Sequence, residues 1–391
     1  MNEVVIVSAK RTATGAFLGA LADRSAAELG SRVIRALLAD SGVAASDISQ
    51  VIMGQVLTAG CGQNPARQSA LNAGLPVNTQ CLTVNKVCGS GLKSVHLGMQ
   101  ALQTGEAEFV IAGGQESMSN APHLLMSSRT GKRIGDNNMK DSLISDGLWD
   151  VFNDYHMGIT AENVATRFNI SREMQDEYAL LSHIKALDAQ TQGIFESEIV
   201  PVEWLTPKGE PRRVDKDEGP RQSSIEKLMQ LKPVFKKGGT VTAGNASSLN
   251  DGAAAVLLCT RDTAVLRGLP ILASLGAFAN SGIEPALMGA APVQAIADCL
   301  SRSGWKPEQV EQLESNEAFA AQALAVIAGS GIPSERINPY GGAIALGHAI
   351  GASGCRILVT LVHGLIRNNQ KRGVAALCVG GGEGVALSVS R

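Results

Sequence analysis

The chain repeats its own sequence pattern, and this duplication restricts the folds that it can adopt. The matching pairs of segments are 37–56 with 299–318, 89–102 with 352–365, and 111–116 with 378–383. These segments follow one another in the same order and with similar spacing in both halves, which indicates an internal repeat. Chance similarity between Ala- and Gly-rich segments is the alternative. We therefore predict two similar halves built from the same elements.

Strand-like and helix-like segments alternate along both halves. Short apolar runs predict strands at 3–9, 50–56, 108–112, 271–278 and 373–378, and apolar residues at helical spacing predict helices at 26–40, 64–73, 92–102, 291–303 and from 351. Such alternation is typical of parallel sheets that helices cover on both faces. The predicted fold class is therefore α/β.

Residues from about 118 to 250 interrupt this pattern. Charged and turn-forming residues are more frequent there, and they separate short helices such as 162–167 and 172–190. We interpret the region as an insertion. The predicted organisation is a first half from 1–118 with 250–268, an inserted loop domain from 119–249, and a second half from 269–391.

Basic residues gather in one part of this insertion. Between 208 and 237 there are nine Lys or Arg against five Asp or Glu, in a chain with a net charge of −2. A solvated loop surface and a binding place for a phosphate-bearing ligand both explain the surplus.

The composition argues against several classes of protein. A net charge of −2 and an aromatic content of 4% do not suit a general nucleic-acid binder. Seven Cys residues without a C-x-x-C pair indicate neither a zinc site nor a disulfide framework. No apolar run approaches 18 residues, and the first residues read as a strand rather than a signal peptide. We expect a cytoplasmic protein with no metal, nucleic-acid or membrane partner.

Cys88 lies between a predicted strand end and a predicted helix start, and it is followed by Gly89-Ser90-Gly91. The free N–H groups and the partial positive charge at a helix start favour a thiolate over a thiol. A buried structural Cys is the ordinary interpretation of an arbitrary cysteine. The setting of Cys88 instead predicts a nucleophile.

The second half places polar residues where strands end and helices begin. Asn316, His348, Cys378 and Gly380 lie in such segments, and the duplication predicts that they converge on Cys88. Each alone has an ordinary structural explanation, such as packing for Cys378. Together they suit acyl transfer, because one Cys can carry an acyl group while the other moves a proton on carbon.

Six motifs carry a resemblance to a known family. They are GQNPARQ (62–68), VCGSGLKS (87–94), GNASSLNDGAA (244–254), NEAFAAQ (316–322), GGAIALGHAIGASG (341–354) and CVGGGEG (378–384). The chain resembles the thiolase family from Glu3 to its C-terminus, and most of all the short-chain biosynthetic type. The resemblance implies a five-layered αβαβα fold with an inserted loop domain, assembled as a homodimer or homotetramer.

The resemblance also implies a role for each polar residue. Cys88 matches the acylated nucleophile, His348 the base that activates it, and Cys378 the acid and base for the α-carbon. Asn316 matches the residue that joins His348, through a water, in one oxyanion hole. The backbone N–H groups of Cys88 and Gly380 form the other.

The implied reaction is that of an acetyl-CoA C-acetyltransferase, a reversible Claisen condensation of two acetyl-CoA molecules to acetoacetyl-CoA and CoA through acyl-Cys88. Coenzyme A is then a substrate and product, and no cofactor is tightly bound. The positions that resemble the coenzyme A tunnel are His156, Met157, Arg221, Phe235, Ala243, Ser247, Ala318 and Phe319.

Some residues depart from the family pattern. Ala349 replaces the usual Pro and is expected to loosen the His348 loop, Ser315 replaces Ala, and 338–340 reads Asn-Pro-Tyr instead of Asn-x-Asn. Glu383 stands where Gln or Met is commoner. We predict that this carboxylate points away from Cys378 or is neutralised, because an inward charge would raise the pKa of the thiol.

Three alternatives remain at this point. A degradative 3-ketoacyl-CoA thiolase differs only in tunnel shape. A scaffold without activity should lack Cys88, His348 or Cys378, and all are present. A Cys hydrolase would have no use for Cys378. The range of acyl chain lengths, the direction of the reaction and the choice between dimer and tetramer stay open.

Overall fold

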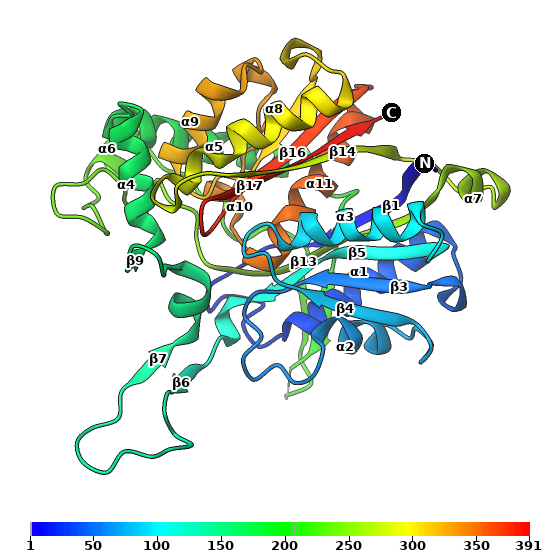
Figure 1. Ribbon diagram of the computed structural model, residues 1–391, viewed down its shortest axis with the longest axis horizontal. Coiled ribbons are helices and arrows are strands. Elements are labelled where there is room, and N and C mark those ends of the chain that lie inside the picture. Colours follow the sequence, from blue (N-terminus) through cyan, green and yellow to red (C-terminus); the bar gives the residue numbers. More distant parts are fainter. Residues whose placement is uncertain (1, 207) are drawn as a thin grey trace.

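The computed structural model describes residues 2–206 and 208–391. One large sheet runs through both halves of the chain (Figure 1). Its strands are β1 (Val4–Thr12), β3 (Gln50–Gly54), β4 (Gln80–Val84), β5 (Phe109–Ser117), β13 (Asn250–Thr260), β14 (Ala273–Gly282), β15 (Gln312–Ser315), β16 (Arg372–Val379) and β17 (Glu383–Ser390), with the short β2 (Gly15–Ala16) and β10 (Ile199–Val200) attached to it.

The strand order follows the predicted duplication. In the first half the order is β1-β13-β5-β3, with β4 at the edge, and in the second half it is β14-β17-β16-β15. The two halves join where β1 pairs with β14 through Val5 with Ser274 and Ile6 with Ala273. Each strand of the second half thus has a counterpart in the first, so the predicted two-fold repeat is confirmed.

The prediction of parallel sheets is wrong for much of this sheet. The pairs β3–β4, β3–β5 and β15–β16 are parallel, whereas β1–β13, β13–β5, β14–β17 and β16–β17 are antiparallel. The helices connect the parallel strands, as a crossover requires. β17 follows β16 after a short turn instead, and β13 enters only after the long insertion, so both can run in the opposite direction.

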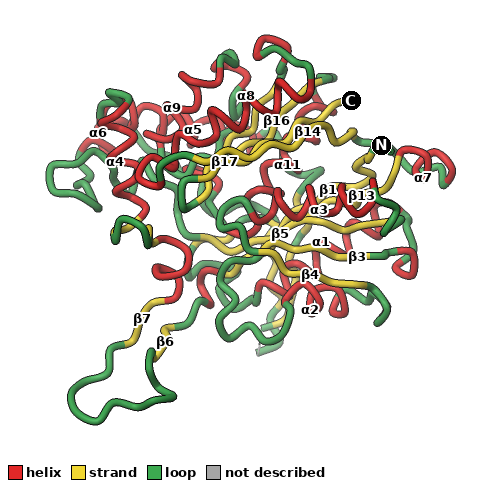
Figure 2. Tube along the Cα trace, in the orientation of Figure 1, coloured by secondary structure: helices red, strands yellow, loops and turns green. Residues whose placement is uncertain are grey.

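Helices lie on both faces of the sheet and between its halves, so that the layers alternate as αβαβα (Figures 1 and 2). One outer layer holds α1 (Ala26–Ser41) and α2 (Pro65–Asn72), and the other holds α8 (Ala291–Ser303) and α9 (Ala320–Ser330). The middle layer holds α3 (Ser90–Gln103) and α11 (Ile350–Arg367), which contact each other and strands of both halves. The predicted five layers are therefore observed.

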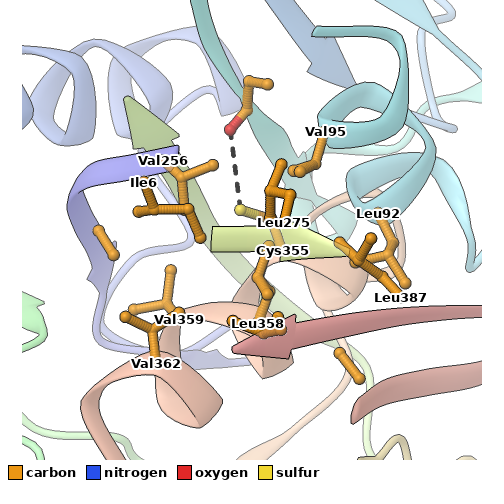
Figure 3. Packing of buried hydrophobic residues seen from close by; sticks show 14 of the residues in the cluster. Ile6, Leu92, Val95, Val256, Leu275, Cys355, Leu358, Val359, Val362 and Leu387 are labelled. Carbon is orange, nitrogen blue, oxygen red and sulfur yellow. Dashed lines mark hydrogen bonds between the residues drawn. The ribbon is translucent and has the colours of Figure 1, made fainter. Parts of the chain in front are cut away.

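The middle layer forms the largest core. Figure 3 shows Leu92 and Val95 of α3 on one side of this core and Leu358, Val359 and Val362 of α11 on the other, among strand residues of both halves. All five of these side chains are fully buried. Burying such aliphatic side chains contributes about 1.5–3 kcal/mol each, so this layer is a major source of stability.

Two glycines allow the middle helices to approach closely. A Cβ at Gly354 of α11 would lie 2.5 Å from Leu92 N, and a Cβ at Gly91 of α3 would lie 2.8 Å from Cys355 N. These glycines are equivalent in the duplication, so each half supplies one side of the contact. The first residues of α3 and α11 therefore lie side by side.

The inserted region, 118–249, adds smaller elements on one side of the molecule. Its hairpin of β6 (His123–Leu125) and β7 (Met139–Asp141) projects away from the layers in Figure 1. The other elements are β8 (Trp149–Asp150), β9 (Tyr155–His156), α4 (Met157–Arg167), α5 (Arg172–Thr191), β11 (Val202–Leu205), β12 (Pro211–Val214) and α6 (Ile225–Met229). The remaining short helices α7 (Arg261–Leu266) and α10 (Ala343–Leu346) lie outside it.

Helix α11 qualifies the expectation that no apolar run approaches a membrane span. It has 18 residues and a mean hydropathy of 1.3, so by length and composition it could cross a bilayer. However, 83% of it is buried inside the protein. The helix is apolar because it fills the space between the two halves of the sheet, where most of its surface meets other side chains.

A substitution at the helix contact tests this packing. We expect Gly354→Ala to destabilise the protein by about 1–3 kcal/mol or more, because the added methyl group meets the backbone of α3. Urea unfolding followed by circular dichroism measures the change. Gly282→Ala is the matched control, since nothing lies within 4 Å of a Cβ there and its φ is unstrained. Equal stability of the two variants would contradict close packing at Gly354.

Candidate active site

Cys88 lies in a tight turn between β4 and α3. Val87 has a φ of +45°, in the left-handed region that β-branched residues rarely adopt. Ser90 holds this turn, because its Oγ donates to Val87 O (2.6 Å) and accepts from Lys86 N–H (2.8 Å). The turn therefore presents Cys88 beside the first turn of α3, in the position that the sequence predicts.

Burial dominates the ionisation of Cys88. Loss of solvent raises the pKa of the thiol to about 11, and the Glu116 carboxylate adds to this effect. Hydrogen bonds from the backbone N–H groups of Gly380 and Cys88 lower the pKa by less. The prediction that the helix start favours a thiolate is therefore wrong for the free protein. Cys88 is a thiol at neutral pH, and it needs a base to become a nucleophile.

His348 lies just before α11, the counterpart of α3. Its backbone N–H donates to Asn250 Oδ1 (2.8 Å), and Asn250 Nδ2 donates to Gly15 O (2.8 Å). Gly347 has a φ of +101°, and a Cβ there would lie 2.4 Å from the Asn250 side chain, so the chain needs glycine before the histidine. Because the two helices lie side by side, Cys88 and His348 face one cavity.

The hydrogen bonds of the His348 ring assign its tautomer. Ser353 Oγ donates its only hydrogen to Ala349 O (2.8 Å), so it accepts the bond from His348 Nδ1 (2.6 Å). Burial, and then the charge of Arg356, lower the pKa of His348 to about 4. The ring is therefore neutral at pH 7, with its lone pair on Nε2, which can accept a proton.

Asn316 approaches this nitrogen from the second half. It follows β15 and is fully buried, and its Nδ2 lies 3.5 Å from His348 Nε2. Its Oδ1 has no hydrogen-bond partner in the part of the chain that the structure describes. Buried polar atoms normally have partners, so this amide can still bind a water or a ligand atom.

Cys378 and Gly380 complete the group. Cys378 lies in β16 and is fully buried; burial, and then the neighbouring Cys88, raise the pKa of its thiol above the usual range. A thiolate formed at Cys378 is therefore a strong base. Gly380 lies in the turn after β16, where a Cβ would lie 3.4 Å from Val87. The backbone N–H of Gly380 lies close enough to Cys88 to lower the pKa of its thiol.

A cavity of about 360 Å³ joins these residues to the inserted region. Cys88, His348 and Gly380 line it, whereas Asn316 and Cys378 are fully buried and are not among its lining residues. Most of the positions predicted for coenzyme A also line it, namely His156, Met157, Phe235, Ala243, Ser247, Ala318 and Phe319. The structure therefore brings these residues of the insertion and of the second half together around Cys88.

Aromatic rings shape one wall of the cavity. The rings of His156 and Phe235 stack with centroids 4.6 Å apart, and Phe235 meets Phe319 edge to face at 6.3 Å. His156 also begins α4, because its Nδ1 accepts from Gly158 N–H (3.0 Å). Burial lowers the pKa of His156, so this wall is neutral and largely apolar.

Arg221 is the predicted coenzyme A position that lies outside the cavity. Its side chain is exposed, and its backbone N–H donates to His183 Nδ1 (3.4 Å). The chain runs over the surface between α5 and α6 here. Arg221 can therefore meet only a ligand that extends beyond the cavity.

The sequence analysis missed other residues of the site. Asn250 lies in the motif 244–254, so its hydrogen bond to His348 could have been sought there. The unpredicted apolar residues of the cavity are Met118, Leu148, Val234, Ala246, Leu249, Met288 and Ile350. No signal distinguishes them in the sequence, because single apolar residues look like core residues.

Metal ligands do not gather around this cavity. Across residues 2–206 and 208–391, no three His, Cys, Asp or Glu side chains are placed to hold a metal ion.

The sequence matches the thiolase N-terminal domain over residues 4–262 and the thiolase C-terminal domain over residues 269–391. The chain belongs to the thiolase family. The acetyl-CoA acetyltransferase of Pseudomonas aeruginosa is 56% identical to it over 392 residues, which cover 100% of both chains.

Two solved thiolase structures resemble this one closely. The crystal structure of the Bacillus anthracis acetyl-CoA acetyltransferase has a TM-score of 0.98 at 40% identity. The human mitochondrial 3-ketoacyl-CoA thiolase has a TM-score of 0.96 at 41% identity. Each match covers 100% of this chain and 99% of the other. The fold alone therefore does not separate these two kinds of thiolase.

The residues that depart from the thiolase pattern fit the site. Ala349 has a φ of −69°, which a proline would also adopt, and Asn250 and Ser353 hold His348 on either side. These two hydrogen bonds hold His348 without a proline, and the loosening of its loop by Ala349 stays a prediction. Glu383 pairs with Lys86 at 2.6 Å, which confirms the prediction that its charge is neutralised.

Removal of the Ser353 hydroxyl tests the tautomer of His348. We expect Ser353→Ala to lower kcat of thiolysis by between about 10- and 100-fold, because general-base catalysis supplies about 10²–10⁴ in rate and needs the free lone pair on Nε2. Ser315→Ala is the matched control. Its hydroxyl is also buried near Asn316 but has no partner among the described residues. A similar loss in both variants would contradict the specific role of Ser353.

Proposed function

We propose that the chain is an acetyl-CoA C-acetyltransferase that condenses two acetyl-CoA molecules reversibly to acetoacetyl-CoA and CoA. One observation carries the proposal: a half-buried thiol and a neutral imidazole, at the starts of two equivalent helices, line one apolar cavity together with Gly380. The names of the full-length relatives support the same reaction.

In the first step His348 Nε2 takes the proton of Cys88 as the sulfur attacks the carbonyl carbon of acetyl-CoA. The N–H groups of Cys88 and Gly380 are directed toward this sulfur and can bind the oxyanion that forms on the attacked carbonyl. The thioester bond to CoA then breaks, and the departing CoA sulfur takes a proton from Cys378. The products are acetyl-Cys88, CoA, a Cys378 thiolate and protonated His348.

In the second step the Cys378 thiolate takes a proton from the α-carbon of another acetyl-CoA. Burial raises the pKa of this thiol, so its thiolate is basic enough for a carbon acid. Asn316 Nδ2 and His348 lie where they can stabilise the enolate, in part through a water. The α-carbon attacks acetyl-Cys88, the sulfur leaves, and His348 returns its proton to Cys88. All groups are then restored.

Coenzyme A is substrate and product in this scheme, and no tightly bound cofactor takes part. Phe235, Phe319 and His156 suit the pantetheine arm because their wall is apolar. The basic surplus at 208–237, with Arg221 outside the cavity, suits the phosphates at the other end. We assign binding of coenzyme A to the inserted loop domain, 119–249. The rest of the chain forms a first half, made of 1–118 with 250–268, and a second half, 269–391.

The proposal extends to assembly and location. We propose a homotetramer or homodimer, since the inserted domain offers exposed apolar residues such as Met139 and Leu125 on its projecting hairpin. We also propose that the protein is cytoplasmic.

A 3-ketoacyl-CoA thiolase for longer chains is the second candidate. The human mitochondrial enzyme matches this fold almost as well as the bacterial one. Met157 and Met288, which line the cavity and pack against the cluster around Cys378, are the residues that would limit chain length.

A thiolysis assay with CoA separates these candidates. We expect turnover of acetoacetyl-CoA and little turnover of a 3-ketoacyl-CoA of six to ten carbons. Cys88→Ala should abolish activity, because no other group can carry the acyl intermediate. Good activity on the longer substrates would favour the second candidate. A folded protein that binds CoA but turns over neither would overturn both.

A further inference from the structure

Glu116 is a fully buried carboxylate that the reaction scheme does not use. It ends the first-half segment 111–116, whose counterpart in the second half ends at Glu383. Its two oxygens accept three backbone N–H groups, from Val56 (2.9 Å), Leu57 (3.2 Å) and Gly351 (2.9 Å). Within the described ranges no Lys, Arg or His forms an ion pair with it. A buried charge without a counterion is costly and calls for an explanation.

One side of the carboxylate holds the support of the nucleophile. Val56 and Leu57 follow β3, and together with Ile350 they belong to the apolar cluster against which Val87 and Cys88 pack. The two N–H bonds fix this loop through its backbone, so the apolar support beneath Cys88 depends on the position of the carboxylate.

The other side of the carboxylate holds the helix of the base. Gly351 lies in the first turn of α11, three residues after His348. A Cβ there would lie 2.8 Å from both Gln55 Cα and Glu116 Oε2. The helix start therefore rests directly on the carboxylate and on the loop that the carboxylate holds.

From this geometry we propose that Glu116 is a positioning residue. Its two oxygens hold both the loop that supports Cys88 and the helix that follows His348. Glu116 thereby fixes the separation of Cys88 and His348. The inference rests on the proposed reaction, in which the imidazole takes the proton of Cys88 directly. Glu383, its counterpart, makes an ion pair with Lys86 instead. Of these two equivalent residues, only Glu116 links a loop to a helix start.

The charge of Glu116 adds a measurable signature. Burial, and then Asp251, raise its pKa to about 7, while the three N–H bonds oppose the shift. The negative charge of Glu116 raises the pKa of two thiols, those of Cys88 and Cys61. Removal of the charge should therefore lower the pKa of Cys88, whereas a shorter acid should keep that pKa and lose the positioning.

Two variants test the proposal. Glu116→Gln keeps the size but points an amide N–H₂ at a backbone N–H, and Glu116→Asp keeps the charge but is one methylene too short. We expect kcat of acetoacetyl-CoA thiolysis to fall by at least about 10-fold in both, with KM within about twofold, because an interaction that serves the transition state affects kcat. Glu383→Gln is the matched control and should stay within about twofold. Circular dichroism verifies that each variant is folded.

Alkylation of Cys88 by iodoacetamide provides a readout without substrate. Its rate plotted against pH should shift to lower pH in Glu116→Gln, but not in Glu116→Asp or Glu383→Gln. Folded variants with unchanged kcat and an unchanged alkylation profile would overturn the proposal. If the wild-type protein has no thiolysis activity, the reaction scheme fails, and the alkylation profile alone decides whether Glu116 acts on Cys88.

Discussion

The structure depends on the close approach of α3 and α11 in the middle layer. Gly91 and Gly354, equivalent residues of the two halves, leave room for the backbone of the opposite helix. A duplicated fold thereby brings two helix starts together, although they come from residues more than two hundred positions apart. One start presents Cys88 and the other presents His348. The chemistry of the site follows from this contact.

Burial then determines how the site can react. Burial keeps Cys88 and Cys378 as thiols and His348 as a neutral imidazole, so neither cysteine is a thiolate in the free protein. Hydrogen bonds determine which nitrogen of His348 carries the hydrogen. Ser353 Oγ accepts from His348 Nδ1, so the lone pair of the ring is on Nε2. The thiol of Cys88 therefore needs a base to take its proton when it attacks a substrate carbonyl.

The fold could be predicted from the sequence to the extent that local pattern determines it. The repeat indicated equivalent halves, and helical spacing located α1, α3 and α8 within about two residues of their observed ends. Strand direction could not be predicted, because it depends on where a chain re-enters the sheet. The thiol of Cys88 was expected to ionise because the helix start is visible in the sequence and the desolvation is not. Asn250 reaches His348 through a hydrogen bond between residues 98 positions apart. Ser353 lies five residues after His348, but the sequence does not show which way its hydroxyl points.

In the proposed reaction Cys88 carries the acyl group while Cys378 moves the proton. Mass spectrometry of the protein after incubation with acetyl-CoA, with peptides mapped after acid quenching, tests this claim most directly. We expect a single acetyl group on the peptide that contains Cys88, and we expect added CoA to remove this acetyl group. An acetyl group on Cys378, or none on either cysteine in a protein that catalyses thiolysis, would contradict it.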